Sequence, residues 1–145
     1  MNETFDFLGD LSKINPFVDQ YADVTSYTDT GSYILNALIS GSIYKGLPGN
    51  KITALAGESA TGKTFFLMGM IRQFVKDNKT GGVIFFESES AITHDMFEER
   101  EIDKNRVTML PVSTVEEFRT QAMTILKRVQ ETPESERHPL LFCLD

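Results

Sequence analysis

Residues 57–64 read Gly-Glu-Ser-Ala-Thr-Gly-Lys-Thr and match the pattern G-x-x-x-x-G-K-[ST]. In a loop of this kind, successive backbone N–H groups point inward and, together with the positive end of the following helix, bind phosphate oxygens. The two glycines allow a close approach that a Cβ atom would block, the lysine supplies a mobile positive charge, and the threonine offers its hydroxyl to Mg²⁺. The sequence therefore predicts a nucleotide-binding loop made of Gly57, Glu58, Ser59, Ala60, Thr61, Gly62, Lys63 and Thr64.

The segments that flank this loop have the composition that the motif requires. Residues 52–56 are apolar and predict a buried strand, and residues 65–75 are apolar on most faces and predict a largely buried helix. Further apolar runs at residues 83–86, 107–110 and 140–144 predict three more strands. Near-continuous apolar strands that alternate with helices indicate a parallel sheet with helices on both faces. The predicted fold class is therefore α/β.

Three further helices are predicted from apolar spacing and from end signals. Residues 33–38 have helical spacing with Gly41 as the stop, and a short helix is predicted over residues 94–100. Residues 113–116 predict a capping box, in which the Ser113 hydroxyl accepts from the backbone N–H of Glu116 while the Glu116 side chain reaches back. The helix that follows is predicted to carry one apolar stripe, made of Val115, Phe118, Ala122, Ile125, Leu126 and Val129.

The first thirty residues differ in character from the rest. Residues 5–14 predict a short amphipathic helix, and residues 17–30 are polar and aromatic and favour extended structure. We therefore divide the chain into an arm or oligomerisation segment, residues 1–30, and a core, residues 31–145. The alternative is that residues 1–30 are an N-terminal extension packed on the core.

Length, charge and cysteine usage exclude several classes of protein. The chain has 145 residues, about one domain, and 41% of them are hydrophobic, which is ordinary for a globular protein. The formal net charge of −7 argues against a surface that is basic throughout, although a local basic patch is compatible with it. A single cysteine, an acidic N-terminus and apolar runs far shorter than the roughly 20 residues of a membrane span predict a cytoplasmic protein outside the membrane.

Hydrolysis of a nucleotide needs an acid that holds the Mg²⁺ shell and a group that orients the attacking water. Asp145 follows an apolar strand and is a candidate for the first role, because ligands bind at the carboxyl ends of parallel strands. Glu87 and Glu89 follow another strand, and two carboxylates at i and i+2 on extended chain point to the same side. One of them could hold a water while the other faces a neighbouring loop. The alternative for Asp145 is an aspartate that merely ends a strand at a turn. The alternative for Glu87 and Glu89 is a solvated acidic turn.

The sequence from about residue 30 to residue 145 resembles the core of RecA-like recombinases, most closely the phage UvsX type. The resemblance includes Thr30-Gly31 before a helix, Gly46-Leu47-Pro48, the Walker A loop of residues 57–64 and a final Walker B strand. Its most specific part is the stretch Phe-Glu-Ser-Glu-Ser-Ala-Ile-Thr at residues 86–93. The resemblance implies a P-loop NTPase fold, with residues 31–145 as the first part of a RecA-like ATPase core.

By the same resemblance, individual residues acquire expected roles around ATP and Mg²⁺. Glu89 corresponds to the catalytic glutamate that polarises the attacking water, Lys63 to the phosphate residue, and Thr64 and Asp145 to the Mg²⁺ residues. Thr93 falls where the family places a side chain near the adenine. Met96 falls where the family usually has an aromatic that stacks on the base, and Glu87 where an aspartate is common.

The resemblance also implies a biological setting. In such recombinases, ATP bound between subunits drives a helical filament on single-stranded DNA, used in homologous recombination and repair together with mediator proteins. The N-terminal arm docks on the next subunit, and a phage-encoded member acts in the host cytoplasm. In this family the DNA-binding loops follow the Walker B strand in sequence. A strand that also follows it in sequence is inserted in the sheet between the Walker A and Walker B strands. The chain is therefore expected to be an N-terminal part that leaves strand edges unpaired and does not itself bind DNA.

Two other classes of protein share part of this pattern. A helicase-type ATPase of RecA fold, or a circadian-clock-type relative, would have the same loop and the same glutamate. A non-catalytic, nucleotide-binding or filament-modulating fragment would have the loop without turnover. The Walker A loop alone does not separate these classes, because many ATPases share it.

Overall fold

The computed structural model describes residue 24 and residues 26–145. The helix predicted over residues 5–14, and most of the arm predicted over residues 1–30, lie outside the described residues. In chain order the elements are β1 (Tyr27–Thr28), α2 (Tyr33–Ser40), β2 (Leu47–Pro48), α3 (Lys63–Asp77), β3 (Gly82–Glu87), α4 (His94–Glu98), the 3-10 turn η1 (Lys104–Arg106), β4 (Val107–Pro111), α5 (Val115–Glu131), the 3-10 turn η2 (Glu134–Glu136) and β5 (Leu140–Leu144).

A three-stranded parallel sheet of order β4-β3-β5 forms the centre of the described part. The middle strand, β3, is apolar from Gly82 to Phe86 and ends in Glu87, and this apolar run is what the sequence predicts for a strand covered on both faces. It pairs in parallel with β4, Val83 opposite Val107, and with β5, Gly82 opposite Leu140. This confirms the predicted α/β class and three of the four predicted core strands. Because the strands run the same way, their carboxyl ends share one edge.

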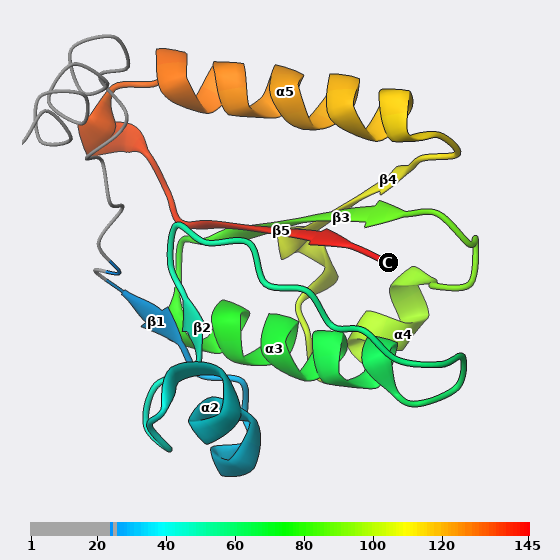
Figure 1. Ribbon diagram of the computed structural model, residues 1–145. Coiled ribbons are helices and arrows are strands. Elements are labelled where there is room, and N and C mark those ends of the chain that lie inside the picture. The colour runs from blue at the N-terminus through cyan, green and yellow to red at the C-terminus, as the bar shows by residue number, and fades with distance from the viewer. Residues whose placement is uncertain (1–23, 25) are drawn as a thin grey trace, which may run out of the picture.

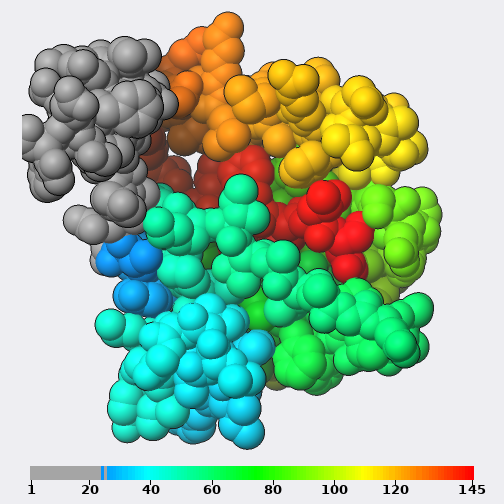
Figure 2. Space-filling model, in the orientation of Figure 1, coloured from blue at the N-terminus to red at the C-terminus, as the bar shows by residue number. Residues whose placement is uncertain are grey.

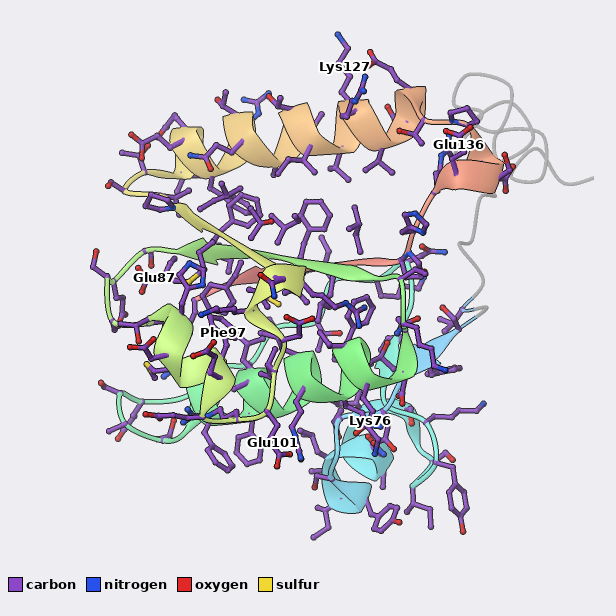
Figure 3. All side chains as sticks on the ribbon, turned by 180° about the vertical axis from the view of Figure 1, so that it is seen from behind. Lys76, Glu87, Phe97, Glu101, Lys127 and Glu136 are labelled. Atoms are coloured by element: carbon purple, nitrogen blue, oxygen red, sulfur yellow. The ribbon has the colours of Figure 1, made fainter. Side chains whose placement is uncertain are left out.

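Helices cover both faces of this sheet (Figure 1), as predicted: α5 lies on one face, and α3 with α4 on the other. On the α3 face, the rings of Phe85 and Phe97 meet edge to face at 5.7 Å between centroids. Figure 3 shows Phe97 between the sheet and the helical layer. On the α5 face, Phe86 meets Phe118 at 4.9 Å. Each aromatic pair stabilises its layer by about 0.5–1.5 kcal/mol beyond burial.

A small unit precedes the sheet in sequence. Strand β1 pairs antiparallel with β2, so residues 27–28 of the predicted arm bond to the part that follows it. Helix α2 ends at Ser40, and the predicted stop, Gly41, is its C-cap in the left-handed region. The buried amide of Asn36, in α2, connects this helix to the chain segments before and after it. Its Oδ1 accepts from the Thr30 N–H and hydroxyl, and its Nδ2 donates to the Asp29 carboxylate and to the Ile43 carbonyl.

The predicted strand at residues 52–56 does not form. Residues 52–57 have no regular secondary structure and make no backbone–backbone hydrogen bond to any described residue. Ile52 is 101% exposed. The physical reason is the absence of a neighbour, because within the described residues the edge of β5 that faces away from β3 has no strand bonded to it. An apolar run becomes a strand only when another strand satisfies its backbone groups.

The predicted start of α5 is displaced by one residue. Thr114, not Ser113, is the N-cap, and its hydroxyl accepts from the Glu117 N–H at 3.1 Å. The carboxylate of Glu117, not of Glu116, reaches back and accepts from the Ser113 N–H at 2.7 Å. The sequence Thr-Val-Glu-Glu satisfies the capping pattern as well as Ser-Thr-Val-Glu does, so the pattern alone could not fix the first residue.

Burial of the helices is less complete than predicted, and α4 ends two residues earlier, at Glu98. In α5, Ala122 is buried and Phe118 and Ile125 pack on the sheet, whereas Val115 and Leu126 of the predicted stripe are exposed. In α3 the burial is confined to one side, and Phe65 and Phe66 are exposed. A helix packed on a sheet buries only the side that faces the sheet, so apolar residues elsewhere on α3 and α5 stay exposed.

Candidate functional site

Three segments meet at the carboxyl edge of the sheet. They are the loop of residues 57–64, the end of β5 at Asp145, and the turn of residues 88–91 that follows β3. Figure 2 shows the end of β5 (red) at the surface beside the residues that follow β3. These are the segments that the sequence singled out, and the edge on which they lie is the usual ligand side of a parallel sheet.

The loop is closed by its own side chains. The Lys63 ammonium donates to the carbonyl oxygens of Gly57 at 3.1 Å and Glu58 at 2.8 Å, and the Thr61 hydroxyl donates to the same Glu58 carbonyl at 2.8 Å. A Cβ on Gly57 would lie 2.9 Å from the Thr61 hydroxyl oxygen, so any larger residue would displace that hydroxyl from its place in the loop. Lys63 thus has partners that an incoming phosphate group can replace.

The start of α3 has the electrostatics of an anion site. Gly62 has φ +90° and is the N-cap, so it has no side chain to accept from the first N–H groups of the helix. The first turn reads Lys-Thr-Phe-Phe, and its charge adds to the positive end of the helix dipole rather than cancelling it. Unpaired N–H groups, a positive helix end and a lysine on one loop favour phosphate.

A hydrogen bond connects this helix to the end of β5. The Thr64 hydroxyl donates to Oδ2 of Asp145 at 2.7 Å, across 81 positions in sequence. A hydroxyl and a carboxylate at this distance are oxygen donors that fit Mg²⁺, which takes one or two protein ligands and fills its other positions with water and phosphate. Among residues 24 and 26–145, no cluster of three or more His, Cys, Asp or Glu could hold a metal by itself. Thr64 and Asp145 would therefore act together with a bound nucleotide.

The turn after β3 separates the two candidate carboxylates. Glu87 is buried, and its carboxylate accepts hydrogen bonds from the backbone N–H groups of Ser90 and Ala91. Glu89 is exposed. The expectation that both point to the same side holds for a continuing strand, but β3 ends at Glu87 and the chain turns. Of the two, Glu89 is the one that a water could reach.

Sequence reasoning missed one member of this site, Ser88. Its N–H and its hydroxyl both donate to the main-chain carbonyl of Asp145, at 3.0 and 2.8 Å. The turn after β3 and the end of β5 are thus bonded directly. The position of Ser88 between two glutamates was the available signal, but a serine there also suits an ordinary solvated turn.

The two residues expected near the adenine lie farther along the chain. Thr93 is exposed and directly precedes α4, and Met96 is half-buried and packs against the hydrophobic core. The thioether of Met96 therefore already has an apolar environment in this arrangement. The structure brings Lys63, Thr64 and Asp145 together, whereas no hydrogen bond among the described residues joins Thr93 or Met96 to them.

The cysteine is not a candidate nucleophile. Cys143 is buried within β5, and burial, reinforced by the negative charge of Asp145, raises the pKa of its thiol to about 12. A thiol with such a pKa stays protonated at neutral pH and is a poor nucleophile.

Comparison with known proteins adds no relative: no family model and no curated protein sequence matches the chain. Within the described part, none of the helices combines the length and the apolar character that a membrane crossing requires.

Proposed function

We propose that the chain binds Mg²⁺ and ATP at the loop of residues 57–64 and belongs to the ATPase core of a RecA-like recombinase. The observation that carries the proposal is the 2.7 Å hydrogen bond between Thr64 and Asp145. Two residues selected independently, one by a loop motif and one by a strand end, are in direct contact. A chance glycine-rich turn would have no reason to lie against the acid at the end of another strand.

The residues of the site would divide the work of phosphate binding as follows. Backbone N–H groups of the loop and of the first turn of α3 bind phosphate oxygens, and Lys63 exchanges its carbonyl partners for the β- and γ-phosphates. Thr64 and Asp145 hold the metal shell, and Mg²⁺, when bound, neutralises charge that develops on the phosphates. Glu89, exposed beside this edge, orients the attacking water.

The assignment to a recombinase, rather than to ATPases in general, depends on the sequence of residues 86–93. This stretch forms the end of β3, which carries Glu87, and the turn that carries Glu89, so the most specific part of the resemblance coincides with the site. The proposed partners are further copies of the same protein in a filament, single-stranded DNA, and mediator proteins. The adjacent basic pair Lys127-Arg128 is exposed on α5, and Figure 3 shows Lys127 pointing away from the sheet. This basic pair is explained by its place on the solvated face of α5 and is not proposed as a DNA contact.

The test is binding of ATP by calorimetry with Mg²⁺ present and with the metal chelated. Lys63→Ala removes a charge-assisted contact worth about 1.5–3 kcal/mol, so we expect affinity to fall roughly 10- to 100-fold. Lys79→Ala is the matched control, because Lys79 lies in the turn beyond the opposite end of α3. Equal affinity of wild type and Lys63→Ala would refute the assignment of the loop. Binding without any hydrolysis would favour the non-catalytic alternative.

A further inference from the structure

We infer that Glu87 is a positioning residue whose carboxylate fixes the turn of residues 88–91 and thereby holds Glu89 at the phosphate side of the site. The inference rests on the proposed function and goes beyond it. The role is not catalytic in itself, because the carboxylate of Glu87 faces its own turn and not the solvent.

The carboxylate of Glu87 and the backbone N–H groups of Ser90 and Ala91 form a hydrogen-bonded group, called the clamp below. Glu87 is 7% exposed, and its two carboxylate oxygens accept from two successive backbone N–H groups, those of Ser90 and of Ala91, the second at 2.9 Å. A buried carboxylate is expensive unless it is hydrogen-bonded, and charge-assisted bonds of this kind are about twice as strong as neutral ones. The bonds therefore stabilise one conformation of the turn strongly.

The other side of the turn has its own anchor. Ser88 donates its N–H and its hydroxyl to the carbonyl of Asp145, and Asp145 in turn accepts from Thr64. Glu89 lies between the two anchors, one residue after Ser88 and one before Ser90. Ser90 has φ +56°, a left-handed conformation that is uncommon for serine and that the two hydrogen bonds to Glu87 stabilise here. The backbone that carries Glu89 is thus fixed relative to Asp145.

A carboxylate is the group that this clamp needs. Glutamine has one acceptor oxygen and an NH₂ donor, so in Glu87→Gln one of the two N–H groups would face another donor. Aspartate keeps two acceptor oxygens on a side chain one methylene shorter, and it can still accept from part of the turn. The clamp therefore predicts an order of effect: wild type, then Glu87→Asp, then Glu87→Gln.

The experiment measures the turn and the reaction separately on the full chain. Hydrogen exchange of the Ser90 and Ala91 amides, followed by NMR without nucleotide, reports the clamp. We expect exchange to accelerate at least about tenfold in Glu87→Gln, since a lost charge-assisted bond is worth 1.5–3 kcal/mol. Hydrolysis is followed in single turnover with protein in excess over radiolabelled ATP, and affinity for ATP by calorimetry. Glu89→Gln gives the background rate of hydrolysis, called the Glu89→Gln floor below. Glu99→Gln is the charge-matched control, because Glu99 is exposed and directly follows α4.

We expect the rate of hydrolysis to fall while the affinity for ATP stays nearly unchanged. Glu87→Gln should hydrolyse ATP roughly 10- to 100-fold more slowly than wild type, because small misplacements of a catalytic group have effects of this size, while its affinity for ATP changes by less than about twofold. Glu87→Asp should lie between the two. A merely structural role would lower affinity and rate together and would not be rescued by aspartate.

Each contrary result has a distinct meaning. If wild type fails to bind ATP, the proposed function is wrong. If wild type binds and hydrolyses ATP but Glu87→Gln has an unchanged rate or unchanged amide exchange, the positioning role alone is wrong. Binding with no hydrolysis above the Glu89→Gln floor also refutes it, because no reaction is left for the turn to serve. If Glu87→Gln fails to fold by circular dichroism, Glu87→Asp decides: wild-type rate despite faster amide exchange would refute the role.

Discussion

Glu101 adopts a backbone conformation that suits glycine better than glutamate. Its φ is +58°, and it ends the segment that contains α4, where the Glu101 N–H donates to the Glu98 carbonyl and the Ile102 N–H to the Phe97 carbonyl. This is the arrangement in which helices most often place a glycine, because a Cβ atom is disfavoured in the left-handed region. The exposed contact of the Glu101 carboxylate with Arg72 offers little compensation.

We therefore expect Glu101→Gly to stabilise the protein. The free energy of unfolding, measured by urea titration, should rise by about 0.5–1 kcal/mol, because relief of the left-handed Cβ outweighs a surface ion pair. Arg72→Ala is the control that removes the ion pair alone, and it should change the same free energy by less than about 0.5 kcal/mol. A loss of stability in Glu101→Gly that matched Arg72→Ala would show that the ion pair matters and the backbone does not.

Individual site residues differ in how far the sequence could predict them. The proximity of Thr64 and Asp145 follows from two rules that need no knowledge of the rest of the chain: the fixed spacing of the loop motif and the common edge of parallel strand ends. The separate roles of Glu87 and Glu89 could not be predicted, because they depend on where β3 stops and on the left-handed conformation of Ser90. The hydrogen bond from Ser88 to the main-chain carbonyl of Asp145 could not be predicted either, because a serine between two glutamates suits a solvated turn equally well.

At the scale of elements, composition predicts a strand only where a partner exists. Residues 83–86 and 140–144 have the same apolar character as residues 52–56, and they form β3 and β5 because they bond to each other. Residues 52–56 have no such partner among the described residues and remain exposed. Periodicity describes what a segment can bury, and the neighbouring element decides whether it does.

Two isoleucines test this difference. Ile71 in α3 is 0% exposed, whereas Ile52 is fully exposed. Ile71→Ala should lower the free energy of unfolding by about 2–5 kcal/mol, since it removes buried apolar volume and leaves a cavity. Ile52→Ala should change it by less than about 0.5 kcal/mol. Urea titration of both variants gives the comparison, and a large effect of Ile52→Ala would mean that residues 52–56 are buried in solution.

For the whole molecule, the sheet shields one chemical group that can be followed in solution. Cys143 lies inside the hydrophobic cluster between the sheet and α3, and the pKa of its thiol is raised to about 12, first by burial and then by Asp145. At pH 8 the folded protein then has only ~10⁻⁴ of this thiol as thiolate, against about a tenth or more in an unfolded chain. Ionisation is thus disfavoured only while the sheet is packed.

We expect Cys143 to resist thiol reagents in the native state. Reaction with Ellman's reagent at pH 8 should be at least ~10³-fold slower in the folded protein than in urea, because only the thiolate reacts and the folded state suppresses it. Any reaction of the folded state by this route should become faster with each unit of pH up to about 12. Equal rates with and without urea would show that β5 opens freely.

The register of β5 also determines which changes of length the chain tolerates. Asp145 reaches Thr64 because five residues of β5 pair in order with residues 82–86. Deleting one residue from β5 would draw Asp145 back by about 3.3 Å and turn its side chain to the opposite face of the sheet. Residues 52–56, which are bonded to no described strand, can gain or lose a residue without such a shift. Natural variation in length should therefore accumulate before the loop and be excluded from β5.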